Sequence, residues 1–426
     1  MKRIFLTLAL ACALAVGCAL PAQAAESAIQ EVYVVSINGF DWVPSHPAWA
    51  TSSAWVEDGV TMVPAEEFFQ TLAGPSLSDP AAYETRPDGV LTRWDEDGSN
   101  VLTVTWGHDH VLTLTPGAET MTVDGQEVAL PLPARFEDGV FCVPLRPVAE
   151  ALGMTVSWIG IPEVEFPKNQ VTVDSLEDLL NAVAPDTEIT LAPGEYSFGA
   201  LDLEKIDNPY VEISYDVFDR TTGLWGTGSV WEVVIRDVRD LTILAGGARV
   251  STPWAYADVW RFVNCDRLRM EGGVAVHDVE PGYCVGNCVE LEDCVGVYLR
   301  EVVMDGSGAY GLYASGSRQV ELDQCAIQNC TYGAVSLWNC QNMELWMCQI
   351  ADCRDCFELV AGFQTQDVRI RHCVFRGNSA NALTGFDGWN LVFGHCTFRD
   401  NRFGVINDHG WQSSGGAAFY ECTGLE

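Results

Sequence analysis

Apolar residues recur at a period of about 23 residues along the C-terminal part of the chain, from residue 170 to residue 426. Within a repeat they follow the pattern V-x-L-x-x-C-x-I, an alternation that predicts a strand with one buried side. The repeats align into four columns: Val297, Val320, Met343, Val368 and Leu391; Leu299, Leu322, Leu345, Ile370 and Phe393; Val302, Cys325, Cys348, Cys373, Cys396 and Cys422; and Met304, Ile327, Ile350, Phe375 and Phe398. Each repeat can bury its apolar side only against its neighbours, so the period predicts a solenoid of stacked parallel strands.

This repeat resembles the coil of a right-handed parallel β-helix, the pectin-lyase-like fold. We expect one such domain over residues 170–426, with about nine or ten coils. A leucine-rich repeat is the alternative for a period of this length, but the leucine spacing and the asparagine of that repeat are missing. The predicted class is therefore mainly β.

A short helix should cover the first coil. Asp174 or Ser175 can act as its N-cap, and the helix should run to Ala184. Its apolar side is predicted to hold Leu176, Leu179, Leu180 and Val183.

The stretch 31–160 holds a different repeat, in which a short β segment ends in Val-Pro and leads into an amphipathic helix. Gly59, Val60, Val63, Pro64 and Leu72 recur eighty residues later as Gly139, Val140, Val143, Pro144 and Leu152. Residues 123–158 resemble the copper-amine-oxidase N-terminal-like domain, also called a stalk domain. The resemblance implies a small α+β domain that attaches or spaces an exported bacterial protein, without copper chemistry. His108 and His110 could form a metal pair, but an exposed hairpin explains them more simply.

The N-terminus has the pattern of a signal peptide over residues 1–24. Lys2 and Arg3 precede an apolar run from Ile4 to Leu20, and an Ala-x-Ala cleavage site ends at Ala24. The run is too short to span a bilayer, and no other segment could cross one, so we expect a secreted or cell-surface protein and not an integral membrane protein. A lipoprotein signal ending at Cys18 is the alternative.

Charge narrows the choice of partner. The chain carries 59 Asp and Glu against 23 Lys and Arg, a formal net charge of −36. This charge excludes nucleic acid and an anionic membrane surface, and it favours a neutral glycan or a cell-envelope component as partner. An anionic glycan would need a bridging divalent cation such as calcium. We expect no other cofactor and no dedicated metal site.

Cysteine is abundant, with 16 residues, of which 13 lie between residues 265 and 422. In an exported protein this number suggests disulfides. However, side chains of one column stand ~4.8 Å apart, whereas the Cβ atoms of a disulfide are ~3.8 Å apart. We therefore predict a mostly reduced ladder, with Cys284 and Cys288 as the pair most suited to a bridge.

One predicted corner of the solenoid combines tyrosines, carboxylates and a histidine. Tyrosine faces and carboxylate acceptors suit sugar rings, so this corner is a candidate ligand site. Its residues are His277, Glu280, Tyr283, Tyr310, Tyr332 and Asp355. The motif series is similar to a group of bacterial β-helix repeat proteins, to which we attach no activity. The alternative is that these residues only form and cover turns.

No complete catalytic motif is present. The carboxylate cluster and base of a pectate lyase are missing, as are the paired aspartates of a polygalacturonase. Faint candidates for acid/base chemistry are Asp352, Asp355, Asp408 and His409, and Trp338 and Trp389 are candidate platforms or packing residues. We therefore expect a surface β-helix that binds glycan or another surface partner. The alternative is a polysaccharide lyase or glycoside hydrolase, and the third possibility is a spacer.

Overall fold

The computed structural model describes residues 30–43, 45–46, 49–52, 54–73, 90–95, 100–107, 109–219, 224–226, 229–279, 285–306, 308–408 and 416–425. The predicted leader, Glu280, Tyr283, Cys284 and His409 lie outside the described residues.

In its described residues, the N-terminal domain consists of small, mostly antiparallel sheets and the helices α1 (Ala65–Ala73) and α3 (Leu145–Ala151). One sheet has the order β1 (Gln30–Val32), β6 (Ala54–Glu57), β7 (Val60–Pro64), β14 (Val140–Pro144), β13 (Arg135–Glu137). A second has the order β12 (Gln126–Ala129), β11 (Thr120–Val123), β10 (His110–Leu114), β9 (Leu102–Trp106), β8 (Val90–Trp94). A third has the order β15 (Thr155–Trp158), β16 (Pro162–Glu165), β2 (Val35–Ile37), β3 (Phe40–Trp42), and β4 (Ser45–His46) pairs with β5 (Trp49–Ser52). Strand β16 pairs with β2 in parallel.

The two copies of the eighty-residue repeat pack directly against each other. Strand β7 leads into helix α1 (Ala65–Ala73), and strand β14 leads into helix α3 (Leu145–Ala151). The strands pair antiparallel with Val63 opposite Val143, so equivalent residues of the two copies face each other. Both helices bury their apolar sides in one core, and Gly153 ends the second repeat with a φ of 83°.

The C-terminal domain is a β-helix with three faces, which we number in the order the chain enters them. The first face holds β17 (Asn169–Val173), β18 (Thr187–Leu191), β24 (Thr242–Leu244), β27 (Asp266–Glu271), β30 (Val295–Arg300), β33 (Arg318–Asp323), β36 (Gln341–Trp346), the second halves of β38 (Cys356–Arg371) and β40 (Ser379–Gly394), and β43 (Ala417–Tyr420). The second face holds β19 (Gly194–Ser197), β25 (Ala248–Thr252), β28 (Val274–His277), β31 (Val303–Asp305), β34 (Ala326–Gln328), β37 (Gln349–Ala351), β39 (Val374–Arg376) and β41 (Thr397–Arg399).

The third face lies between the second face and the first. It holds β20 (Val211–Ser214), β23 (Glu232–Arg236), β26 (Trp260–Val263), β29 (Val289–Glu292), β32 (Tyr310–Ser315), β35 (Gly333–Trp338), the first halves of β38 and β40, and β42 (Arg402–Asp408). Apart from the antiparallel pair of β20 and β23, these strands run parallel. An excursion after β19 contains two 3₁₀ turns, η2 (Phe198–Ala200) and η3 (Leu203–Lys205), and a small hairpin of β21 (Phe218–Asp219) and β22 (Leu224–Trp225).

The four predicted columns are confirmed as the interior of the β-helix. Leu299, Leu322, Leu345 and Ile370 stand in register on successive strands, and each is at most 1% exposed. The cysteine column fills the corner between the first and second faces. Its thiols donate to backbone carbonyls one coil back, as from Cys348 Sγ to Leu322 O at 3.3 Å. A thiol therefore serves this position as a small apolar group with one weak donor.

The β-helix has about seven turns, fewer than the nine or ten expected. The difference comes from the first coil, because β18 pairs directly with β24, 54 residues further on (Glu188 opposite Thr242). Residues 198–231 are an excursion within that coil, and the chain returns to the regular stack at β23.

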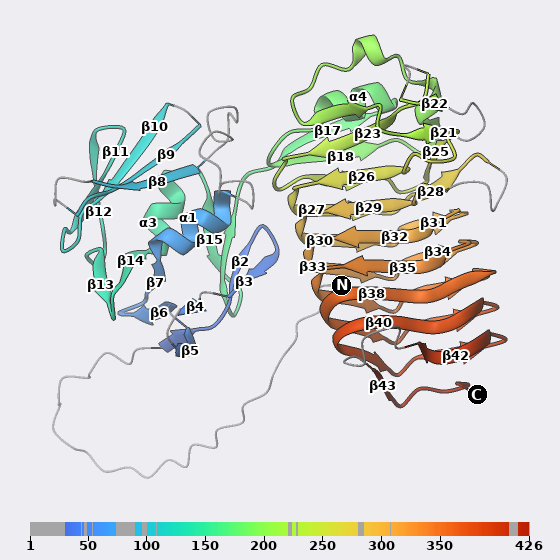
Figure 1. Ribbon diagram of the computed structural model, residues 1–426. Coiled ribbons are helices and arrows are strands. Elements are labelled where there is room, and N and C mark those ends of the chain that lie inside the picture. The colour runs from blue at the N-terminus through green and yellow to red at the C-terminus, as the bar shows by residue number, and fades with distance from the viewer. Residues whose placement is uncertain are drawn as a thin grey trace.

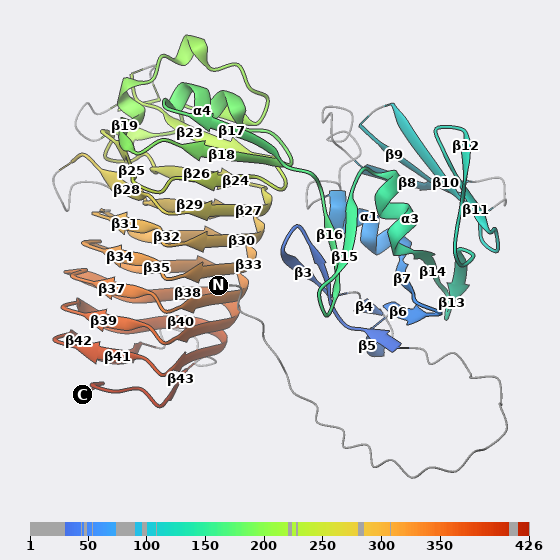
Figure 2. The same ribbon diagram turned by 180° about the vertical axis from the view of Figure 1, so that it is seen from behind.

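Helix α4 (Leu176–Ala182) covers the N-terminal end of the β-helix, as predicted (Figures 1 and 2). Ser175 is the N-cap, and its hydroxyl accepts a hydrogen bond from the backbone N–H of Asp178. The helix ends two residues before the expected Ala184, and Leu176, Leu179 and Leu180 are buried on the first coil.

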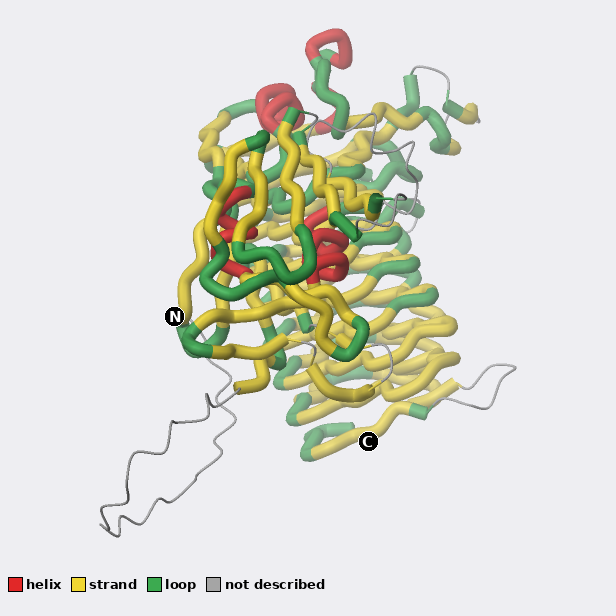
Figure 3. The backbone as a smooth tube through the Cα atoms, turned by 90° about the vertical axis from the view of Figure 1, so that its left-hand side faces the viewer, coloured by secondary structure: helices red, strands yellow, loops and turns green. Residues whose placement is uncertain are grey.

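The N-terminal domain lies beside the β-helix rather than in line with it, next to β27, β30 and β33 (Figure 1). Viewed from that side, the domain covers much of the β-helix behind it (Figure 3). Among the described residues, no helix is both long and apolar enough to span a membrane.

The buried apolar columns of the β-helix lead to a testable prediction. Changing Leu345 to Ala should lower the free energy of unfolding by ~2–5 kcal/mol, because the cavity cannot collapse between fixed coils. Urea denaturation followed by circular dichroism measures the change. Gln349→Ala, at an exposed position of the same coil, is the control and should leave the midpoint nearly unchanged. Equal urea midpoints for the two variants would contradict the placement of Leu345 in the interior.

The thiols make the second prediction. All thirteen cysteines among the described residues are free, and Cys422 alone of these is only partly buried. Titration of the denatured, unreduced protein should therefore detect most of its thiols, whereas the folded protein should react slowly because burial blocks access. Mass spectrometry that finds five or more disulfides would refute this arrangement.

Candidate functional site

Exposed aromatic side chains gather on two successive coils of the third face. At the start of the strands, the rings of Tyr310 and Tyr332 lie 6.3 Å apart edge to face, and Tyr332 lies 5.9 Å from Phe357. At the strand ends, the rings of Trp338 and Phe363 lie 5.0 Å apart. We call the four exposed members, Tyr332, Phe357, Trp338 and Phe363, the aromatic ladder; they are 37%, 56%, 45% and 36% exposed.

The strand register explains why these rings are exposed. Outward positions in the middle of the strands form one column: Arg261, Glu290, Tyr313, Ser336, Ala361 and Gly385. On the coils that carry the aromatic ladder, this column holds only Ser336 and Ala361. Small residues in the centre leave the large rings standing at both edges. The side chain of Asp408 lies outside the described residues.

Ser336 connects the two edges of the ladder. The indole N–H of Trp338 donates to the Ser336 hydroxyl at 3.2 Å, and Tyr310 is hydrogen-bonded to the same hydroxyl. Gly333 makes room for the Tyr310 ring, because a Cβ there would lie 2.8 Å from that ring and 2.3 Å from the Glu358 carbonyl. Burial, and next the charge of Glu358, raise the pKa of Tyr310, so its hydroxyl remains a hydrogen-bond donor.

A carboxyl cluster adjoins the ladder on the N-terminal coils of the same face. Arg261 forms ion pairs with Glu232, with Glu290 at 3.5 Å and with Glu292 at 3.1 Å. Buried Asp258 accepts hydrogen bonds from the backbone and side-chain N–H groups of Asn287, at 2.6 and 2.9 Å.

Asp258 and Glu290 lie within hydrogen-bonding distance of each other. Asn287 also donates to Glu290 at 2.9 Å, and the Asp258 carboxyl is hydrogen-bonded to Glu290. Burial raises the pKa of Asp258 well above 3.8, and the charges of Glu290 and Glu232 raise it further. Burial also raises the pKa of Glu232, against the opposing effect of Arg261. The cluster therefore keeps a protonated carboxyl beside a guanidinium.

The structure brings together part of the predicted ligand corner. Tyr310 and Tyr332 are in contact, and exposed Asp355 lies two residues before Phe357 on the next coil. His277, however, is buried at the end of β28, with Nε2 2.8 Å from the carbonyl of Ala257, and burial lowers its pKa. It therefore has no surface from which to contact a large ligand.

The faint catalytic candidates do not converge. Asp352 occupies a turn with a φ of 54° and pairs with Arg354 at 3.6 Å and Arg376 at 3.8 Å. Trp389 is 61% exposed and pairs with Gln366 where the chain passes from the third face to the first, so it is not part of the ladder. Within the described ranges, no group of three or more His, Cys, Asp or Glu side chains could hold a metal ion.

Sequence reasoning missed the carboxyl cluster and the two phenylalanines. The alternation Val289, Glu290, Leu291, Glu292 does place two carboxylates outward, and this was the available signal. Asp258 follows the long excursion of the first coil, so no column identified its position.

Family comparisons agree with both halves of this architecture. Residues 268–423 match the family described as right handed beta helix region, and residues 46–163 match the copper amine oxidase N-terminal domain. The chain is a right-handed β-helix protein with a copper-amine-oxidase N-terminal-like domain. No curated protein matches it significantly.

Several solved structures are similar to parts of this chain, with low TM-scores. The periplasmic alginate epimerase AlgG is 9% identical, with a TM-score of 0.29, over 60% of this chain and 55% of that one, so this chain spans just over half of its length. The surface adhesin PfbA of Streptococcus pneumoniae is 8% identical, with a TM-score of 0.26, over 57% and 83%. The AlgE6 A-module, a mannuronan C-5 epimerase of Azotobacter vinelandii, is 11% identical, with a TM-score of 0.22, over 60% and 89%.

The raised pKa of Asp258 makes the stability of this β-helix protein sensitive to pH. A carboxyl whose folded pKa is raised stabilises the fold below its unfolded pKa and loses that contribution as pH rises through the folded pKa. The pH range in which Asp258 lowers the free energy of unfolding therefore begins near pH 3.8 and extends upward. Asp258→Asn keeps the acceptor oxygen and removes the titration, so its unfolding free energy should fall less than that of the wild type between pH 4 and pH 8.

Urea midpoints at several pH values measure this difference. Asp355→Asn, at an exposed carboxylate, is the control and should follow the wild type. If Asp258→Asn also follows the wild type at every pH, the proton is not held at this pair.

Proposed function

We propose that this protein binds a neutral glycan across the third face of its β-helix, at the surface of the cell that exports it. The observation that carries the proposal is the aromatic ladder on two successive coils. Packing of the β-helix interior does not require large aromatic rings to be exposed on adjacent coils. Aromatic faces stack on the C–H faces of sugars, so a sugar ligand would explain their exposure.

The dimensions of the face support a short stretch of polysaccharide. Tyr332 and Trp338 stand at opposite ends of β35 (Gly333–Trp338), which corresponds to ~16–20 Å of strand. Such a length suits two or three sugar rings. Tyr313 and the edge of the carboxyl cluster adjoin the rings and supply hydrogen-bonding groups for hydroxyls.

Charge supports a neutral ligand. The chain carries a formal net charge of −36, and carboxylates outnumber guanidinium groups on the coils beside the ladder. An anionic polysaccharide would be repelled unless calcium bridged it to these carboxylates. The leader pattern of residues 1–24 supports export, and the N-terminal domain would then serve as the attachment module.

Binding of soluble polysaccharides tests the proposal. The protein from residue 25 onward is assayed by affinity electrophoresis with xylan, galactomannan and mixed-linkage β-glucan, and with pectate and alginate in the presence and absence of calcium. Retardation by at least one neutral polymer is expected. Retardation by none of them, or by an anionic polymer without calcium, would refute the proposal.

Substitutions then locate the site. Tyr332→Ala and Trp338→Ala should each weaken binding about tenfold, since a stacked ring contributes ~1 kcal/mol or more. Trp158→Ala removes an equally exposed tryptophan, 50% accessible, from the N-terminal domain and should change nothing. Unchanged affinity in both ladder variants, with the fold intact by circular dichroism, would exclude this face.

The carboxyl cluster favours a second candidate, a polysaccharide lyase or glycoside hydrolase. The raised pKa of Asp258 favours its protonated form, and that proton is one a leaving oxygen could receive. Against it, hydrogen-bonded carboxyls are closer than the ~5–9 Å between the two carboxylates of most glycosidases. Reducing ends and unsaturated products, followed with the same polymers, decide the matter: turnover that Glu290→Gln abolishes would establish catalysis, and no turnover would leave binding alone.

A further inference from the structure

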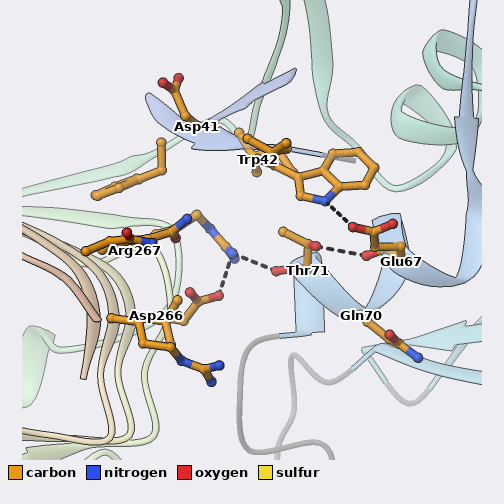
Figure 4. Close-up of a pocket in the computed structure, with 15 residues that line it drawn as sticks. Asp41, Trp42, Glu67, Gln70, Thr71, Asp266 and Arg267 are labelled. Carbon is orange, nitrogen blue, oxygen red and sulfur yellow. Dashed lines mark hydrogen bonds and ion pairs between the residues drawn. The ribbon is translucent and has the colours of Figure 1, made fainter. Parts of the chain in front are cut away.

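A cleft of about 520 Å³ lies between the two domains, and no residue of the aromatic ladder is among those that line it. Strand β3 and helix α1 form its wall on the N-terminal domain, and the first residues of strands β30, β33 and β36 form the opposite wall (Figure 4). This volume is within the range of small-molecule sites, which often occur at domain interfaces.

The walls of the cleft are held together by buried contacts. Arg267 reaches from the β-helix to the end of helix α1, where its guanidinium donates to the carbonyl oxygens of Thr71 at 2.6 Å and Leu72 at 3.4 Å (Figure 4). Asp240 and Asp266 pair with the same guanidinium. Phe40 packs 3.3 Å from where a Cβ of Gly296 would stand, so the glycine admits the ring. The cleft is therefore preorganised.

One corner column of the β-helix supplies the opposite wall. Arg267, Gly296, Gln319 and Asn342 occupy the same corner on successive coils, each with a φ between 52° and 68°. Arg267 and Gly296 already take part in contacts between the domains. Gln319 and Asn342 lie one and two coils further on, where the domains separate, and both side chains are exposed to the cleft.

The polar groups of the cleft divide into engaged and available ones. Glu67 accepts from the Trp42 indole at 3.2 Å, and Asp266 pairs with Arg267. In the described part of the chain, five other lining side chains make no hydrogen bond or ion pair: Asp41, Gln70, Arg318, Gln319 and Asn342. They comprise one carboxylate, one guanidinium and three amides.

We propose that this cleft binds a short neutral oligosaccharide, at a site separate from the aromatic ladder. Amides both donate and accept, a carboxylate accepts from two hydroxyls and a guanidinium donates, which matches a ring whose hydroxyls do both. The lining carries three carboxylates, of Asp41, Glu67 and Asp266, against two guanidinium groups, of Arg267 and Arg318, so a neutral ligand fits better than an anion. Phe40 and Val295 supply apolar surface for the ring faces.

Calorimetric titration with cellotriose, maltotriose and triacetylchitotriose tests the site on the full chain. At least one should bind the wild type in the millimolar range or better. Arg318→Ala removes a group from the β-helix wall and should weaken that binding about tenfold. Gln70→Ala removes an amide from the opposite wall and should weaken it severalfold. Arg402→Ala, at an exposed arginine of β42, should not change it.

The same titration with Tyr332→Ala separates this site from the ladder. Retained trisaccharide binding in Tyr332→Ala is expected, whatever becomes of polysaccharide binding. No binding of the three trisaccharides, or weakening by Tyr332→Ala but not by Arg318→Ala, would overturn the proposal. An effect of Arg318→Ala without one of Gln70→Ala would also overturn it, because the site would then belong to the β-helix alone.

Discussion

The buried guanidinium of Arg267 is the contact on which the arrangement of the two domains depends. It pairs with Asp240 and Asp266 inside the β-helix and caps the carbonyl end of helix α1 in the other domain. Burial alone would raise the pKa of Asp240, but Arg267 lowers it to about 2, so the pair stays charged. Removing either partner would leave an uncompensated buried charge, which is strongly destabilising.

Neighbouring groups reinforce this centre. Asn38 donates from its side chain to Asp240 and accepts the backbone N–H of Phe166 at 2.8 Å, so it binds the β-helix to the segment that leads into it. Arg239 pairs with Asp186 and Asp240 and lies 4.8 Å from the Phe166 ring. The first coils and the N-terminal domain therefore form one body.

The interior of the β-helix was predictable because its cause is local and repeated. Leu345 has equivalents 23 residues before and 25 residues after it, and such a series can be read without coordinates. The cap at Ser175 was equally accessible, since a hydroxyl before an apolar helix is a local signal. The number of coils was not, because the excursion after β19 has the length of ordinary coils but does not stack as one.

The candidate site was only partly predictable, for a related reason. Tyr310 and Tyr332 belong to the repeat, so their contact followed from the spacing. His277 also belongs to a coil, but its side chain ends buried against Ala257, and a one-dimensional pattern does not give that direction. The pairing of Asp258 with Glu290 and the cleft at Gln319 arise from contacts between distant segments, which no local pattern encodes.

The reduced thiols of the interior carry a kinetic consequence. While the coils are stacked, thiols such as that of Cys348 are shielded from oxidants in solution. Once a coil opens in an oxidising solution, neighbouring cysteines become free to form mismatched disulfides that the native geometry forbids. Unfolding there would be trapped rather than reversed. The lifetime of the protein in such surroundings is then set by the rate at which coils open, not by the equilibrium between folded and unfolded chains.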